Sequence, residues 1–176
     1  MPLPWLVGVK KRKVADVPIF LDDRLWDELE TIINLSGWNY KTNMMLFKLR
    51  DRALICLLIL TGLRISEALR LRKLQFRDYK RRIVLANVKT VKHGLLRTKI
   101  VLPKEGRLRI FTFVFEAWLR EVPKDECYVF PKGTSLRGGS FLWDKPLSRK
   151  RAFWIIKSTT GKFPHWFRAV CETVYG

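Results

Sequence analysis

Two short segments carry residue types suited to holding a phosphate group. The first, residues 61–69, reads TGLRISEAL and contains Arg64 directly after an apolar stretch. The second, residues 165–168, reads HWFR and follows about a hundred residues later. Positions three apart share one face of a helix, so His165 and Arg168 are predicted to project side by side. A guanidinium can bind two phosphate oxygens and an imidazole can transfer a proton, so the pair suits phosphodiester chemistry.

Other residues could assist such a site. Glu67 lies one turn from Arg64 and could orient it through a charge-assisted hydrogen bond. Lys89 and Lys92 lie in a polar link between two apolar segments, from which a lysine can reach into a cleft. Simpler interpretations stay open. Arg64 and Glu67 could form a structural ion pair, and the two lysines could be solvated side chains. His165 and Arg168 could be ordinary surface residues of a basic helix.

The elements that must position these residues are mainly helical. Apolar spacing and capping residues predict helices over residues 23 to about 37, 47–60, 65–71, 110–120, 148–159 and from 164 onward. β-Branched residues predict strands over 82–85 and 95–102, which would form a small antiparallel hairpin that a shorter preceding strand could extend. The segment 131–146 holds three glycines and is predicted to be a loop. The predicted fold class is therefore α+β.

The helix over 47–60 is expected at the centre of the domain. From Ala53 onward it is apolar on nearly every face, which is typical of a buried helix. Gly62 is expected to end it in a left-handed cap. Arg64 would then stand at the junction of two packed helices, which would hold the cation in place.

Composition favours nucleic acid as the partner. The 176 residues include 35 Lys plus Arg against 16 Asp plus Glu, which gives a net charge of +19. A domain this basic repels itself unless a polyanion supplies counter-charge, and nucleic acid is a commoner polyanion than an anionic membrane or an acidic protein. The longest apolar run, 53–60, is too short to span a membrane, and the basic run 10–13 follows the apolar N-terminal residues, the reverse of a secretory signal. An intracellular location is expected, in cytoplasm, nucleoid or a virus-infected cell.

The cysteines argue against a metal site. Cys56, Cys127 and Cys171 are odd in number and far apart, and they form no Cys-x-x-Cys pair. Neither a disulfide framework nor a zinc site is predicted, and no metal or other cofactor is expected. Cys56 lies in the apolar helix and is predicted to be a small core residue.

Taken together, these motifs resemble the tyrosine recombinases, also called phage-type integrases. Residues 61–71 look like the family's first arginine box and residues 165–168 like its second. Residues 88–90 with 99–103 are similar to its catalytic-lysine hairpin, and residues 128–131 followed by 148–161 are similar to the approach to the second box. Residues 18–33 resemble the start of the catalytic domain. The resemblance therefore covers nearly all of the chain beyond residues 1–20, which are expected to be a basic arm or linker.

The resemblance implies a catalytic-domain-like fold and a mechanism for strand cleavage and rejoining. Arg64 and Arg168 would clamp the scissile phosphate of double-stranded DNA. Lys89 would protonate the leaving 5′ hydroxyl, and His165 would assist proton transfer at the nucleophile. The two guanidinium groups would neutralise charge as a metal pair does in nucleases, so no metal is required. Other recombinase protomers are further expected partners.

The chain departs from the family pattern at both ends. In the family, a helix after the second box carries the tyrosine that bonds to the DNA 3′ phosphate, whereas eight residues follow Arg168 here. Tyr175 is about two turns along the same predicted helix, so we expect it to pack and not to reach the phosphate. The short arm stands where the family has a DNA-clamping domain. We therefore expect residues 21–176 to be an integrase catalytic domain that lacks its C-terminal part and is incomplete or inactive alone.

Two other interpretations stay open at this point. The chain could be a plain basic nucleic-acid-binding module, in which the helix after Ser148 tracks the nucleic-acid backbone through Arg149, Lys150 and Arg151 in its first turn. It could also be a regulator that pairs with a full-length recombinase and has no catalytic role.

Overall fold

Helices account for more than half of the residues that the structure describes, and they surround a central helix, α2. The computed structural model describes residues 23–34, 42–79, 82–90, 94–95, 99–134 and 139–175. Its helices are α1 (Asp23–Asn34), α2 (Thr42–Thr61), α3 (Ile65–Leu69), α4 (Arg109–Glu121), α5 (Arg149–Thr160) and α6 (Pro164–Tyr175), with a short 3-10 turn at Lys73–Gln75. Its strands are β1 (Phe76–Tyr79), β2 (Arg82–Leu85), β3 (Lys89–Thr90), β4 (Gly94–Leu95), β5 (Ile100–Leu102), β6 (Pro131–Gly133) and β7 (Phe141–Pro146). The α+β fold class predicted above is confirmed.

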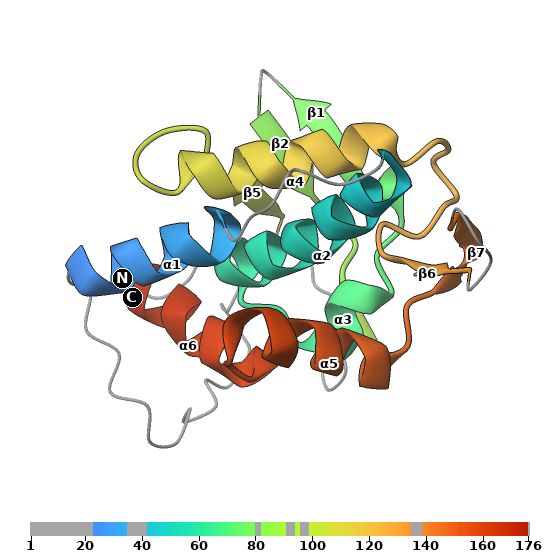
Figure 1. Ribbon diagram of the computed structural model, residues 1–176. Helices are drawn as coiled ribbons and strands as arrows, with labels where there is room; N and C mark the ends of the chain where they lie inside the picture. The colour runs from blue at the N-terminus through green and yellow to red at the C-terminus, as the bar shows by residue number, and fades with distance from the viewer. Residues whose placement is uncertain are drawn as a thin grey trace.

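The central position of α2 follows from its apolar surface. Every residue from Ala53 to Leu60 is at most 2% exposed. Helices α4 and α6 pack against α2 along different sides, and α3 and α5 also contact it (Figure 1). The predicted buried helix is thus confirmed, although it begins at Thr42 and not at Phe47. Residues 42–46 contain no proline or glycine, so nothing in the chain stops the helix from starting earlier.

Helices α1 and α4 are amphipathic, as their apolar spacing predicts. The buried residues of α1 are Leu25, Trp26, Leu29 and Ile32, and the largest buried side chains of α4 are Phe111, Phe115 and Trp118. Trp118 Nε1 donates a hydrogen bond to the Val129 carbonyl at 2.7 Å, which ties α4 to the segment before β6. Helix α1 is described from Asp23 to Asn34, and its predicted end near Gly37 lies outside the described residues, as do all of residues 35–41.

A three-stranded antiparallel sheet in the order β1-β2-β5 packs against α4. Its buried side chains include Phe76, whose ring centroid lies 5.0 Å from that of Phe115 on α4. The predicted strand over 82–85 is confirmed, and so is its antiparallel pairing with the segment that ends at Leu102. The predicted strand over 95–102 is wrong as a single strand: Leu95 pairs with Lys89 in a separate two-stranded ladder, Lys99 lies outside any strand, and Ile100–Leu102 pairs with β2, while residues 96–98 lie outside the described residues.

The predicted loop over 131–146 is wrong, because β6 and β7 pair there as antiparallel strands. Aromatic packing stabilises the pair: the Phe141 ring lies 5.3 Å from Trp118 and 4.5 Å from Phe47, measured between centroids. Two of the glycines that suggested a loop serve this packing instead. A Cβ atom at Gly133 or at Gly139 would overlap the ring of Phe47, so a larger residue at either position would displace that ring.

The last two helices begin where their capping residues predict. Ser148 Oγ accepts the Arg151 N–H at 3.1 Å at the start of α5, and Gly161 ends that helix with φ of 72°. Helix α6 begins at Pro164. Phe153 of α5 is 40% exposed, and its ring packs at the surface on that of Phe163, 5.6 Å away between centroids. None of the helices in the described ranges is long and apolar enough to cross a membrane.

Candidate phosphate-binding site

The C-terminal end of α2 fixes the geometry of the first arginine segment. Thr61 Oγ1 donates to the Leu57 carbonyl at 2.7 Å and accepts the Leu63 N–H at 3.3 Å. Gly62 has φ of 63°, and its N–H donates to the Leu58 carbonyl at 2.9 Å. The predicted left-handed glycine cap is confirmed. The chain therefore turns sharply out of α2 within three residues.

Arg64 stands immediately before α3 and its backbone is held at both ends. Its N–H donates to Glu67 Oε1 at 2.8 Å, and its carbonyl accepts the Ala68 N–H at 3.0 Å. Glu67 is only 4% exposed, so this hydrogen bond is shielded from water. Glu67 thus positions Arg64 through the backbone, while the half-buried Arg64 side chain extends from a fixed point.

Arg168 joins the second segment directly to the first. Its side chain is 6% exposed, and Nη1 donates to the Gly62 carbonyl at 3.1 Å, across 106 residues of sequence. Its Nε lies 3.7 Å from Glu172 Oε1, one helical turn further along α6. The packing of α6 against α2 makes this contact possible (Figure 1).

The charges of the two arginines act on each other. Burial lowers the pKa of the Arg168 guanidinium, and the positive charge of Arg64 lowers it further. The carboxylates of Glu172 and Glu67 act in the opposite direction. Two cations that repel each other beside a glycine carbonyl form a site whose electrostatic energy an anion would lower. The arrangement is therefore suited to a phosphate group.

His165 lies on the same helix but at the surface. It is exposed, while Arg168, three residues later, is buried. Phe167 is fully buried and its ring meets that of the half-buried Trp166 edge to face, at 5.2 Å between centroids. Both aromatic side chains are therefore packing residues. They anchor the start of α6 and with it the position of His165.

Lys89 belongs to the two-stranded β3–β4 sheet. It is exposed in β3, directly opposite Leu95 in β4, and Thr90 Oγ1 donates to the Gly94 carbonyl at 2.7 Å. The structure therefore brings together Arg64, Arg168 and Glu67, and places Lys89 on its own strand pair. Lys92 lies outside the described residues.

The predicted backbone-tracking residues are at the surface of α5. Arg149, Lys150 and Arg151 form its first turn, and all three are exposed. The guanidinium carbon of Arg151 lies 4.5 Å above the ring centroid of Trp154, the distance of a cation–π contact. Since α5 packs against α3, this basic turn belongs to the same helical layer as Arg64.

Sequence reasoning missed two parts of the site. The Gly62 carbonyl, which binds Arg168, has no signal in the sequence because it depends on how α6 packs. Glu172 could have been found, since Arg168 and Glu172 have the i, i+4 spacing of a helical ion pair.

Comparison with known proteins identifies the family and the fold. The model of the phage integrase family matches residues 27–162, a range that contains Arg64 and Lys89 and ends shortly before His165. No curated protein sequence is similar enough to count as a match. The fold is similar to that of the XerH site-specific recombinase in the crystal structure of its pre-cleavage complex with difH substrate, with a TM-score of 0.54 and 18% identity.

That structural match covers 92% of this chain and 44% of the XerH chain. The chain therefore spans less than half the length of the recombinase it resembles, and the likeness shows a recombinase catalytic-domain-like fold. The family model covers well over half of the chain and includes the first arginine segment. The chain belongs to the phage integrase family, the tyrosine recombinases.

Proposed function

We propose that this chain binds double-stranded DNA and holds one backbone phosphate between Arg64 and Arg168, as part of a recombinase that cleaves and rejoins DNA strands. The observation that carries the proposal is the hydrogen bond from Arg168 Nη1 to the Gly62 carbonyl, two residues before Arg64. It joins the two arginine segments at a single point. The charge of Arg64 acts on Arg168, so an anion between them would be attracted to both, while Glu172 and Glu67 offset part of that positive charge.

The chemistry that this site would support is phosphoryl transfer. A hydroxyl nucleophile attacks the phosphorus, and the bond from phosphorus to the 5′ oxygen breaks. Arg64 and Arg168 stabilise the negative charge that builds up on the five-coordinate phosphorus. Removal of one such donor typically lowers the rate by about 10²–10³-fold. Lys89 gives its proton to the leaving 5′ oxygen, and His165 assists the loss of the proton from the nucleophile.

The nucleophilic tyrosine is not assigned to a residue of this chain. Tyr175 ends α6, and seven residues of helix place its backbone roughly 10 Å along the axis from Arg168. A tyrosine supplied by another recombinase protomer would fit the proposal. We would test this with a family member whose catalytic arginines are mutated, mixed with this chain and a nicked DNA site. A covalent protein–DNA adduct that requires both proteins is expected, and its absence where the intact enzyme forms one would exclude supply in trans.

DNA binding tests the phosphate clamp itself. In Arg64→Lys the charge is kept, but a lysine cannot bridge two phosphate oxygens. We expect fluorescence anisotropy with a 30-base-pair duplex to give about tenfold weaker binding, equal to about 1.4 kcal/mol. The matched control is Arg77→Lys, an exposed arginine in β1, which should bind like the wild type.

The same experiment separates the clamp from a plain basic binding module. If only net charge matters, Arg64→Lys and Arg77→Lys should both bind with unchanged affinity and unchanged salt dependence. That result would refute the clamp and favour backbone tracking by the exposed basic turn of α5. Circular dichroism of both variants checks that the fold survives.

A further inference from the structure

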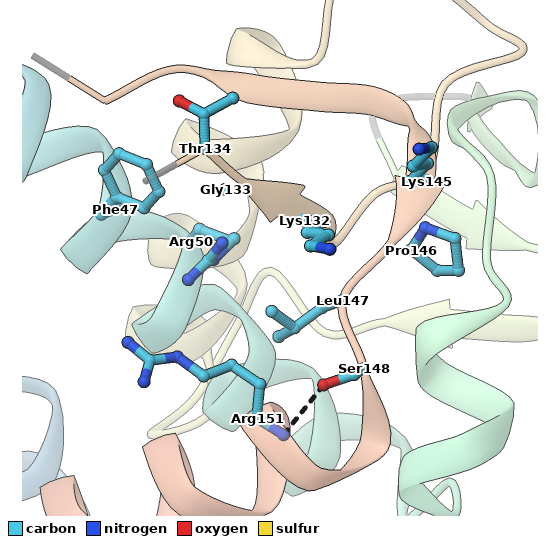
Figure 2. Close-up of a pocket in the computed structure, with 10 residues that line it drawn as sticks. All are labelled: Phe47, Arg50, Lys132, Gly133, Thr134, Lys145, Pro146, Leu147, Ser148 and Arg151. Carbon is cyan, nitrogen blue, oxygen red and sulfur yellow. Dashed lines mark hydrogen bonds between the residues drawn. The ribbon is translucent and has the colours of Figure 1, made fainter. Parts of the chain in front are cut away.

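A cavity of about 660 Å³ lies between α2, the β6–β7 hairpin and the start of α5, and neither Arg64 nor Arg168 lines it (Figure 2). Its lining includes four cations from four different elements: Arg50 of α2, Lys132 of β6, Lys145 of β7 and Arg151 of α5. None of the described residues that line it is acidic. A concave surface with an excess of positive charge concentrates anions.

Arg50 forms the rigid wall of this cavity. It is 4% exposed, its Nη1 donates to the Pro131 carbonyl at 3.0 Å, and its Nε and Nη2 donate to Asp51 Oδ1 at 3.0 and 2.8 Å. Its guanidinium carbon also lies 5.2 Å from the ring centroid of Phe47. Because Asp51 balances its charge, Arg50 serves to fix the hairpin against α2.

The other three cations supply the net charge of the cavity. Lys132, Lys145 and Arg151 are exposed, and among the described residues no salt bridge joins any of them to a carboxylate, although the charge of Asp51 acts on Arg151. Figure 2 shows the two lysines on the hairpin side of the cavity and Arg151 across from them on α5. Ser148, the capping residue of α5, also lines the cavity, so the positive end of the helix dipole adds to the same field.

We propose that this cavity receives a second backbone phosphate of the bound DNA, separate from the phosphate held by Arg64 and Arg168. The inference rests on the proposed DNA-binding function. A volume of about 660 Å³ is much larger than one phosphate group requires, so it leaves room for the adjoining sugars of a continuous backbone. Helix α5 links the two sites, since its first turn borders the cavity and its body packs against α3, which Arg64 precedes. One strand could therefore contact both.

The test compares two double variants that remove the same charge. Lys132→Gln with Lys145→Gln changes the cavity, and Arg77→Gln with Lys124→Gln removes two exposed cations elsewhere. Anisotropy with a 30-base-pair duplex is measured over a series of salt concentrations. Since each phosphate contact contributes about 0.9 to the slope of log K against log salt, we expect the cavity variant to lose about one unit of slope and to bind several-fold more weakly than the control.

Arg151→Gln provides an independent variant, because it changes the cavity from α5 and leaves the hairpin intact. It should weaken binding in the same direction, and thermal melts of all variants should match the wild type.

The possible outcomes separate this inference from the function beneath it. Equal weakening by both double variants would overturn the second phosphate site and leave the arginine clamp standing, provided that Arg64→Lys still weakens binding. A wild-type chain that fails to bind duplex DNA would refute both proposals. Loss of binding to a free nucleotide such as ATP, with duplex binding unchanged, would make the cavity a small-molecule site and overturn the inference.

Discussion

Glu67 offers the sharpest test of how Arg64 is held in place. Its carboxylate has two separate roles in the structure: Oε1 accepts the Arg64 N–H at 2.8 Å, and its negative charge acts on Arg168. Two substitutions separate these roles. Glu67→Ala removes both the acceptor and the charge, whereas Glu67→Gln keeps an amide oxygen that can accept the same hydrogen bond but removes the charge.

The expected losses of stability follow from these contacts. A hydrogen bond to a charged group contributes about 1.5–3 kcal/mol, and a buried N–H left without an acceptor adds a desolvation cost, so Glu67→Ala should lose about 3 kcal/mol. Glu67→Gln should lose about half as much, because it loses only the charged part of the interaction. For a chain of 176 residues, 1 kcal/mol corresponds to about 2–4 °C in Tm. Urea unfolding followed by circular dichroism would measure both losses.

The two variants should differ in the sign of their effect on DNA binding. Glu67→Gln removes a negative charge beside the phosphate site, so its affinity for duplex DNA should rise or stay the same. Glu67→Ala releases the backbone of Arg64, so its affinity should fall. The control is Glu121→Gln, an exposed glutamate at the end of α4. If Glu67→Gln is as unstable as Glu67→Ala, or binds DNA more weakly than the control, the positioning role assigned to Glu67 is wrong.

Two further predictions concern the core. Leu57→Ala empties a fully buried position in α2 and should lower the free energy of unfolding by about 3–5 kcal/mol in urea titrations; a loss below 1 kcal/mol would mean that α2 is not the centre of the domain. Burial raises the pKa of the thiols of Cys56 and Cys171, so at neutral pH both should react with a thiol reagent only after denaturation; rapid labelling of the native protein would contradict their placement.

Local signals in the sequence predicted much of the fold. The all-round apolar surface after Ala53, the glycine at position 62 and the capping residue Ser148 each act within a few residues of chain, so they are visible without tertiary structure. The β6–β7 hairpin was missed because its stability comes from Phe47 and Trp118, which belong to distant helices. Glycine is ambiguous in a sequence, since it suits a loop and a close contact equally well.

In the candidate sites, too, local sequence signals predict some residues, and tertiary packing decides others. Arg64, Arg168 and Glu67 could be predicted from residue type and spacing, and the structure brings them together. The grouping of four cations around the cavity could not be predicted, because they come from elements far apart in the sequence. Arg50, for example, is 81 residues from Pro131, whose carbonyl accepts its hydrogen bond. No local pattern joins α2 to the hairpin. Only the packing of the two elements creates the cavity.

The most direct test of the shared phosphate clamp is a double-mutant cycle for DNA binding. Arg64→Lys, Arg168→Lys and the double variant are compared with the wild type by anisotropy, using protein whose fold is verified by circular dichroism. If both arginines hold one phosphate, the loss in the double variant should differ from the sum of the single losses by about 0.5–3 kcal/mol. Losses that add to within about 0.5 kcal/mol would show that the two arginines act independently, and would contradict a shared phosphate.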